Sequence, residues 1–238
     1  MSGHSHWAGI KHKKSINDAK RAGVFTKLGR LITIAAREGG GNPDTNFKLK
    51  LAIDRARSEN MPKENIERAI KRGTGELKDQ AEIQEIIYEA YGPGQVAMLI
   101  KTATDNKNRT LGEIKSLLAK TGGKIVPAGS VSFLFKQVGN INIAVDKNDL
   151  YDLEMKAIDA GAEDTFYSNN TLTVYTRPED LQKIKENLEK ARMKIKDAAL
   201  VWAPLQKISL SESDKIAYEK LLETLDDQQD VQEIYDNL

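Results

Sequence analysis

Hydrophobic and polar positions repeat with a helical period in the first third of the chain. Apolar residues between positions 24 and 35 fall three and four apart, so they share one helix face that must be buried. A second run, 45–58, follows the turn Asn42-Pro43-Asp44, which can cap a helix. Pro62 suits the first position of a third helix, because its missing N–H costs nothing there. The pattern predicts a small three-helix bundle.

The first helix also carries a line of cations. Gly39-Gly40-Gly41 ends this helix, because glycine takes left-handed dihedrals without a Cβ clash. At about 100° per residue, four cations fall within roughly a third of the helix circumference. They are Lys20, Lys27, Arg30 and Arg37. We expect this stripe to face solvent, opposite the apolar face.

Beyond the bundle the pattern changes to short β-rich runs. Runs at 82–90 and 95–104 flank Gly92-Pro93-Gly94, which indicates a hairpin turn. A helix at 110–120 and a strand at 130–135 follow, so the first unit is ββαβ.

A second unit and a return segment complete the chain. The second unit comprises a strand at 140–145, a helix at 148–160, a hairpin at 163–176 that turns at Asn169-Asn170, a helix at 178–191 and a strand at 195–202. This βαββαβ order is the ferredoxin-like arrangement. A final helix, 211–225, and strand, 230–235, would complete the first unit if the chain returns to it.

These elements predict an α+β protein of three domains, an N-terminal three-helix domain followed by two α+β (ferredoxin-like) domains. The expected boundaries are 1–78 for a basic helical domain with a flexible N-terminal arm, 79–136 plus 207–238 for a discontinuous α+β domain, and 137–206 for a ferredoxin-like α+β domain. A chain of 238 residues is long enough to form several small cores.

Charge divides the chain into a basic and an acidic part. The formal charge of the whole chain is +1, but residues 1–78 carry 17 Lys and Arg against 8 acids, and the remainder carries 19 against 27. Residues 1–41 alone have a net charge of +6. This asymmetry is typical of a protein in which one module meets a polyanion while the rest limits non-specific adhesion.

Composition excludes several classes of protein. The absence of cysteine excludes disulfides, thiol catalysis and cysteine-based zinc sites, and it favours a cytoplasmic location. No apolar run approaches the roughly 18 residues of a membrane helix, and the N-terminus lacks the apolar core of a signal peptide. A mitochondrial presequence would share only the basic, acid-poor character of this N-terminus. We expect no membrane contact and a monomer.

The histidines cluster at His4, His6 and His12, which invites a metal interpretation. A zinc site needs well-placed ligands with a structured second shell, and a flexible cationic segment supplies neither. We therefore expect no metal and no cofactor.

Enzyme signatures also fail: Thr121-Gly122-Gly123-Lys124 lacks the spacing of a phosphate-binding loop, and no nucleophile elbow or zinc-protease helix is present. We expect a protein that is not an enzyme.

The basic N-terminal segment is the main candidate for binding nucleic acid. Its lysines have almost no intervening acid, and they adjoin the cationic helix. Trp7 offers a surface for base stacking, although it could equally anchor the arm to a core. The candidate residues are Trp7, Lys11, His12, Lys13, Lys14, Lys20, Arg21, Lys27 and Arg30. If six to eight cations met phosphates, log K against log[salt] on duplex would have a slope of roughly −5 to −7.

A polar strand-to-helix loop, 104–110, is the candidate for a second contact. Its side chains and the helix N–H groups could receive an anion through Asn106, Lys107, Asn108 and Arg109. Thr110-Leu111-Gly112-Glu113 is also a capping box, so the same cluster has a structural interpretation. The sequence leaves both open.

Several sequence blocks together resemble the YebC/PmpR family, over essentially the whole chain. The blocks in the helical part are Gly3-His4-Ser5-x-Trp7-Ala8-x-Ile10-Lys11-His12-Lys13-Lys14, Asp18-Ala19-Lys20-Arg21, Phe25-Thr26-Lys27-Leu28, Ala35-Ala36-Arg37-Glu38-Gly39-Gly40, Asn60-Met61-Pro62-Lys63-Glu64-Asn65-Ile66 and Ala69-Ile70-Lys71-Arg72-Gly73. Those in the later part are Tyr88-Glu89-x-Tyr91-Gly92-Pro93-Gly94, Thr104-Asp105-Asn106-Lys107-Asn108-Arg109-Thr110 and Gly129-Ser130-Val131. The resemblance implies a helical domain followed by two α+β domains.

The resemblance also implies a nucleic-acid partner. Bacterial members are commonly described as DNA-binding transcriptional regulators, while mitochondrial and some bacterial relatives are associated with translation on the ribosome. This chain departs from the family at His6, where Lys is frequent, and at Gly29, where a larger aliphatic residue is frequent. His6 would weaken a charge contact at neutral pH, and Gly29 would loosen the helix by up to about 1 kcal/mol.

The sequence therefore predicts a non-enzymatic nucleic-acid-binding regulator of gene expression, a DNA-binding transcriptional regulator. The alternative is a translation factor or translational activator associated with ribosomal RNA and the ribosome. A protein-interaction scaffold, in which the charge asymmetry serves partner docking, is the third interpretation. No helix-turn-helix with a reading helix is recognisable, and a flexible basic tail with Trp7 suits RNA at least as well as DNA.

Overall fold

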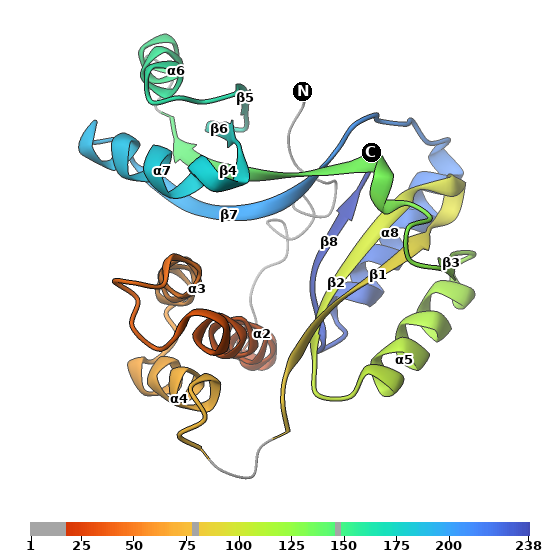
Figure 1. The fold of residues 1–238 in the computed structure, drawn as a ribbon. Helices are drawn as coiled ribbons and strands as arrows, with labels where there is room; N and C mark the ends of the chain where they lie inside the picture. Colours follow the sequence, from red (N-terminus) through yellow and green to blue (C-terminus); the bar gives the residue numbers. More distant parts are fainter. Residues whose placement is uncertain (1–17, 78–80, 146–148) are drawn as a thin grey trace. The chain divides into compact units, whose positions relative to one another are not determined.

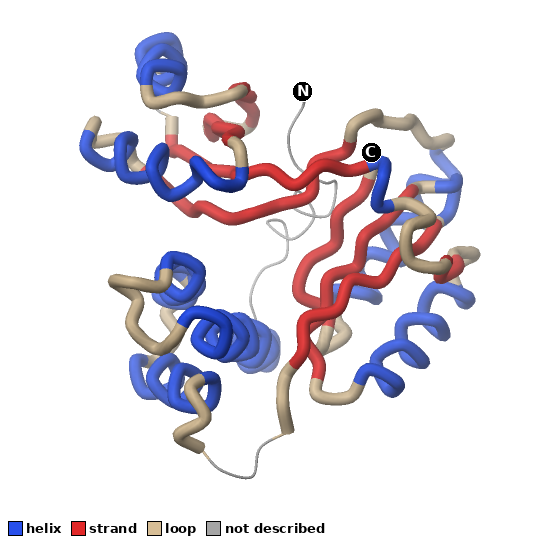
Figure 2. The backbone as a smooth tube through the Cα atoms, viewed as in Figure 1, coloured by secondary structure: helices blue, strands red, loops and turns tan. Residues whose placement is uncertain are grey.

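The computed structural model describes residues 18–77, 81–145 and 149–238, with side chains from Ala22 onward. A helical N-terminal region is followed by two domains that are each built on a four-stranded antiparallel sheet (Figures 1 and 2), which confirms the α+β class. The described residues form two compact units, 18–134 with 204–238, and 135–203. The domain boundaries expected from the sequence are finer than this division and stay predictions.

The helical domain consists of α2 (Asp18–Gly39), α3 (Phe47–Ser58) and α4 (Lys63–Gly73). Both shorter helices pack on α2, and the core between them is mainly apolar. Its buried members are Leu28, Ile32, Ala35, Ala36, Leu49, Ile53, Ala56, Met61, Ile66 and Ala69. From position 32 to 36 every residue of α2 is buried, because Ile34 packs on the opposite side against Ile83 and Ala103. The helix is thus covered on more than the one face that its apolar spacing predicts.

Asn46 joins α2 to α3. Its Oδ1 accepts a hydrogen bond from the Leu49 N–H at 3.0 Å, and its Nδ2 donates to the carbonyls of Ala35 and Gly40, both at 2.8 Å. The predicted cap in the Asn42-Pro43-Asp44 turn is therefore wrong, since a side chain inside the predicted helix caps it two residues later. The glycine end of α2 is confirmed, with Gly40 at φ +84°.

The first sheet has the strand order β3-β1-β2-β8, in which the last strand of the chain pairs with β2. Its strands are β1 (Gln84–Tyr91), β2 (Ala97–Thr104), β3 (Lys124–Val126) and β8 (Val231–Asp236), and the turn η1 (Pro93–Gln95) joins β1 to β2. Two helices, α5 (Lys107–Lys120) and α8 (Glu212–Asp226), cover one face (Figure 1). Ile114, Leu118, Leu221 and Leu225 bury their side chains against that face.

The predicted strand at 130–135 is wrong. The chain turns there through η2 (Ser132–Leu134), and the short β3 takes the edge position beside β1. The cause is Glu89, whose carboxylate accepts hydrogen bonds from the backbone N–H groups of Gly129, Val131 and Ser132 at 2.7, 2.6 and 3.0 Å. These N–H groups are therefore used by a side chain rather than by a β ladder.

The second sheet has the ferredoxin-like order β5-β6-β4-β7. Its elements in chain order are β4 (Phe135–Ala144), α6 (Leu150–Asp159), β5 (Asp164–Ser168), β6 (Thr171–Thr176), η3 (Pro178–Asp180), α7 (Leu181–Lys190) and β7 (Ile195–Pro204). Asn169 and Asn170 form the predicted hairpin turn with φ of 49° and 56°, values that asparagine tolerates well.

Among the described helices, none combines the length and the apolar character needed to cross a membrane.

Candidate nucleic-acid interface

Most of the predicted N-terminal contacts lie outside the described residues. This holds for Trp7, Lys11, His12, Lys13 and Lys14. The backbone of α2 includes Lys20 and Arg21, but their side chains are not described. Their contact with nucleic acid stays a prediction.

Lys27 and Arg30 do not face open solvent, so the expectation of an exposed stripe is wrong for both. Lys27 Nζ donates to the Asp226 carbonyl at 2.5 Å and lies 3.4 Å from Asp226 Oδ1. Arg30 Nη1 donates to the carbonyls of Ala103 and Gln229 at 3.0 and 2.9 Å, and to Asp230 Oδ1. The attraction has a simple origin, because the carbonyl end of α8 and the acids after it form a negative site where α2 passes.

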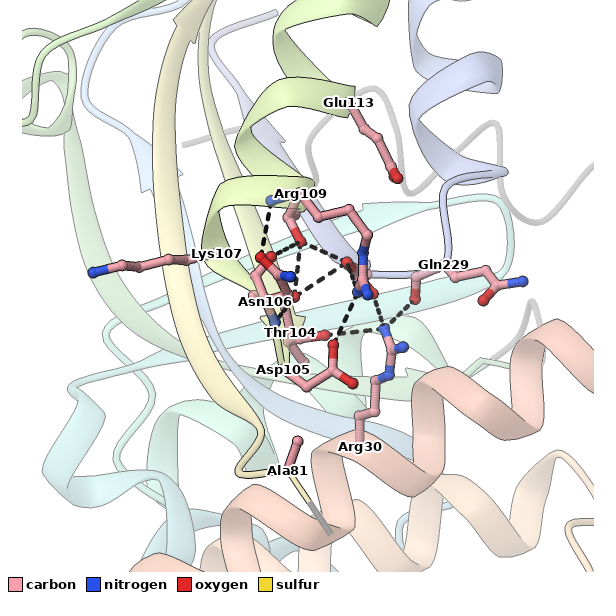
Figure 3. A network of polar contacts seen from close by, with 12 residues as sticks. Arg30, Ala81, Thr104, Asp105, Asn106, Lys107, Arg109, Glu113 and Gln229 are labelled. Carbon is pink, nitrogen blue, oxygen red and sulfur yellow. Dashed lines mark hydrogen bonds and ion pairs between the residues drawn. The ribbon is translucent and has the colours of Figure 1, made fainter.

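Asp230 is the centre of this contact, and its partners Arg30, Thr104 and Arg109 lie in the network of polar contacts shown in Figure 3. Its Oδ2 accepts hydrogen bonds from Thr110 Oγ1 at 2.5 Å, Arg109 Nη2 at 2.9 Å and Thr104 Oγ1 at 3.2 Å. We call Asp230 with Arg30, Thr104, Arg109 and Thr110 the Asp230 cluster. Burial acts to raise the pKa of the Asp230 carboxyl, but the hydrogen bonds from Thr110, Arg109 and Arg30 outweigh burial and lower this pKa to about 2. The carboxylate therefore stays ionised and holds α2, β2, α5 and β8 together.

A second, partly buried contact joins α3 to β8. Arg55 Nη1 lies 2.6 Å from Glu233 Oε1, and the hydroxyl of Tyr235 donates to Glu233 Oε2. Burial acts to raise the pKa of Glu233, but the charges of Arg55 and Lys101 outweigh it and lower this pKa to about 2. We call Lys27, Arg30 and Arg55 the paired cations, because each lies against a carboxylate of α8 or β8 or in the turn between them.

Arg37, the last cation of the predicted stripe, makes a more exposed contact. Its Nη1 donates to Glu82 Oε1 at 2.7 Å and to the Ile83 carbonyl at 2.6 Å. The side chains of Arg37 and Glu82 are 34% and 63% exposed, so water screens this pair far more than the Asp230 cluster.

One part of the loop predicted as a second contact is held by hydrogen bonds within the protein, and the other part faces solvent. Asn106 caps α5 by accepting a hydrogen bond from the Arg109 N–H at 3.1 Å, and the Arg109 side chain reaches Asp105 and Asp230. The capping box at Thr110 is wrong, because α5 begins at Lys107 and Thr110 is buried inside the helix. Lys107 points away from the polar network (Figure 3) and, like Asn108, is exposed. Lys107 and Asn108 thus remain accessible to a ligand.

Four other cations of the helical domain are exposed and have no acidic partner among the described residues. Lys50 and Arg57 lie seven positions apart on one side of α3, and Arg68 and Lys71 lie three apart on α4. We call Lys50, Arg57, Arg68 and Lys71 the open cations. None of the four is among the contacts predicted from the sequence. Their positions in the sequence could have identified them as exposed, because all four fall between the buried positions of amphipathic helices.

Neighbouring cations of α3 and α4 are already engaged. Lys48 Nζ lies 2.7 Å from Glu38, Lys63 lies 3.5 Å from Glu67, and Arg72 donates to the Ala81 carbonyl at 3.0 Å. The open cations can therefore bind phosphate without breaking an ion pair within the described chain. Within the same described residues, His, Cys, Asp and Glu form no group of three or more that could hold a metal ion.

Comparison with known proteins agrees with this architecture. The family model described as the TACO1/YebC protein N-terminal domain matches residues 5–76, and the one described as the TACO1/YebC second and third domain matches residues 83–238. A crystal structure of a conserved hypothetical protein from Aquifex aeolicus superposes with a TM-score of 0.89 at 43% identity, over 98% of this chain and 96% of that one.

Relatives with similar sequences extend over the whole chain. A protein of Thermotoga maritima named "Probable transcriptional regulatory protein" is 50% identical over 238 residues, which is all of this chain and 93% of that protein. A similarly named protein of Caldanaerobacter subterraneus is 49% identical over 241 residues, covering all of this chain and 98% of its own length. With both family models matched in order along it, this chain belongs to the TACO1/YebC family.

Proposed function

We propose that this chain is a non-enzymatic nucleic-acid-binding regulator of gene expression, and that it acts as a DNA-binding transcriptional regulator. The observation that carries the proposal is the set of open cations on α3 and α4, which are exposed and without acidic partners among the described residues. The names of the curated relatives support a role in transcription. The proposal places a monomer in the cytoplasm, with the basic segment 1–21 adding to the same phosphate contact.

The proposed contact is electrostatic. Lysine and arginine side chains neutralise phosphates and release condensed counterions, which gives affinity that depends steeply on salt and little on base sequence. The paired cations contribute less, because a phosphate would have to displace a carboxylate from each of them, and the one that faces Arg30 is buried. Lys107 and Asn108 on the exposed side of the α5 N-terminus are the proposed second contact.

Ribosome-linked control of translation is the second candidate function. The observation that favours it is the burial of α2, the longest described helix, whose residues 32–36 are covered on all sides. This stretch of α2 cannot enter a major groove as part of a reading helix. Recognition by charge and shape, which remains available to the open cations, suits folded RNA as well as duplex DNA.

Crosslinking the full-length protein in cells, followed by sequencing of both the DNA and the RNA recovered, tests the proposal. Enrichment of promoter DNA would support transcriptional regulation, and enrichment of ribosomal RNA would support translation control. The matched control is the variant Lys50→Gln/Arg57→Gln/Arg68→Gln/Lys71→Gln, in which recovery should fall sharply. Recovery of neither nucleic acid by the wild-type protein would refute the proposal and leave the protein-interaction scaffold.

A further inference from the structure

Helix α6 presents a stripe of large apolar side chains to solvent. Tyr151, Met155 and Ile158 are 77%, 42% and 55% exposed. They follow one another at spacings of four and three, so they lie on one face of the helix. We call these three residues the α6 stripe.

The α6 stripe is not the side by which the helix packs on its own sheet. That side is formed by Ala157, which is fully buried, and by the half-buried Leu150 and Leu153. The helix therefore has two apolar sides, and the side with the larger side chains has no cover within the described residues of its own unit, 135–203. Single exposed apolar residues are ordinary, but a contiguous line of them marks an interaction surface.

Acidic residues surround the α6 stripe. Residues 149–164 contain six Asp and Glu and one Lys, and that lysine, Lys156, lies 2.6 Å from Asp152 in an ion pair. Asp152 and Asp159 are both exposed and lie beside the stripe, one turn or less from Met155. This charge repels nucleic acid, so the surface is separate from the basic helical domain in its chemistry.

We propose that the α6 stripe is a docking surface for a basic amphipathic helix of a partner protein. An apolar line at four-and-three spacing is the complement of a second helix with the same spacing, and the flanking carboxylates are the complement of lysines and arginines beside that line. A second copy of this chain fits poorly, because a two-fold contact would bring the two sets of acids together. Ten residues of α6 span about 15 Å, so the contact is small and its affinity is moderate.

Synthetic peptides test this proposal on the full-length protein. The probe is a peptide of about 18 residues with leucines three and four apart and lysines elsewhere, and the reference probe has glutamate in place of every lysine. Wild-type protein should bind the lysine peptide and make it helical, at an affinity at least about tenfold above that for the glutamate peptide. Fluorescence anisotropy and circular dichroism measure the two effects.

Two variants and one control locate the contact. Tyr151→Ser/Ile158→Ser should weaken lysine-peptide binding by about tenfold or more, and Asp152→Asn/Asp159→Asn should weaken it and flatten its salt dependence. Ile216→Ser removes a single apolar side chain of α8 that is 68% exposed, and it should bind as wild type does. All the changed side chains are exposed, and the only ion pair lost is the exposed one between Asp152 and Lys156, so the thermal midpoint should change little.

Three results would overturn the proposal. They are equal binding of the lysine and glutamate peptides, wild-type affinity in both double variants, and a self-association in analytical ultracentrifugation that Tyr151→Ser/Ile158→Ser abolishes. The last result would identify a second copy of the chain as the occupant. None of these outcomes bears on nucleic-acid binding by the open cations, so the two proposals fail separately.

Discussion

The paired cations and the open cations come from the same helical domain, and their environments are opposite. Lys27, Arg30 and Arg55 lie against acids of α8, β8 and the turn between them, with Arg30 bound to a carboxylate that is only 3% exposed. The open cations on α3 and α4 face solvent. Net charge therefore does not locate a binding surface, because part of a basic segment can be neutralised by acids from the other end of the chain.

The energetics of the two groups differ for the same reason. A buried ion pair contributes little net stability when intact, but the loss of one partner leaves an uncompensated charge and is costly. An exposed, unpaired cation can be removed from the free protein at almost no cost, and its loss is felt only when a polyanion binds. Substitutions in the first group should therefore change folding, and substitutions in the second should change binding.

The largest expected effect is that of Asp230→Ala on stability. The substitution removes the carboxylate that Arg30, Arg109 and two threonine hydroxyls share and leaves the largely buried Arg30 without a counter-charge, so the free energy of unfolding should fall by about 3–5 kcal/mol. Urea unfolding followed by circular dichroism measures this loss. Glu223→Ala, which removes an exposed carboxylate from α8, is the matched control. A loss no greater than that of the control would show that the Asp230 cluster does not hold the domains of this unit together.

The next effect is a loss of stability in acid. The pKa values of Asp230 and Glu233 are about 2 in the folded protein, below the ordinary values of about 3.9 and 4.3 in an unfolded chain. Because both pKa values are depressed, the stabilisation is complete above about pH 5 and is lost as pH falls toward 2, by roughly 2–3 kcal/mol for each group. Urea unfolding at a series of pH values measures this, and Asp230→Asn should flatten the curve. An equally steep curve in that variant would contradict the assignment.

Neutralising the open cations should weaken nucleic-acid binding without unfolding the protein. The variant Lys50→Gln/Arg57→Gln/Arg68→Gln/Lys71→Gln should lose about tenfold in affinity for duplex DNA, or about 1.4 kcal/mol, and the slope of log K against log[salt] should flatten by up to about 3–4. Fluorescence anisotropy across a salt series measures both.

The control for this prediction removes the same charge from the first sheet domain. Lys115, Lys120, Lys215 and Lys220 are exposed on α5 and α8, and their side chains have no ion-pair partner among the described residues. Their replacement by glutamine should leave the salt slope close to that of the wild type. Equal effects of the two variants would mean that binding follows total charge rather than the open cations.

The smallest effect belongs to the exposed pair of Arg37 and Glu82. Glu82→Gln should reduce the free energy of unfolding by less than about 1 kcal/mol, because both side chains are partly hydrated. The same urea titrations provide the value. A loss as large as that of Asp230→Ala would show that exposure does not separate the contacts of α2.

Much of the fold follows from the sequence alone. Helical spacing locates α2, α3 and α4, and Asn169-Asn170 locates the β5–β6 hairpin, because these signals are local. The failures have a different origin. The predicted strand at 130–135 fails because Glu89, about 40 positions earlier, binds its N–H groups. In this segment, a side chain that is distant in the sequence overrides the local preference for a β-strand.

The candidate site is less predictable than the fold. The charge asymmetry correctly draws attention to a basic helical segment, but Lys27 and Asp226 are 199 positions apart, and Arg30 and Asp230 are 200 apart. No local pattern indicates that these residues meet. The open cations are also hard to identify from the sequence, because isolated exposed lysines and arginines occur on most surface helices.

Lysine acetylation footprinting with mass spectrometry can distinguish the paired cations from the open cations in a single experiment. In the free protein Lys50 and Lys71 should react readily and Lys27 slowly, because the Nζ of Lys27 is bound to the end of α8. On addition of saturating nucleic acid, Lys50 and Lys71 should become protected, and the slow reaction of Lys27 should not change. A complex in which Lys50 and Lys71 stay reactive, or in which Lys27 is reactive until nucleic acid protects it, would contradict the account.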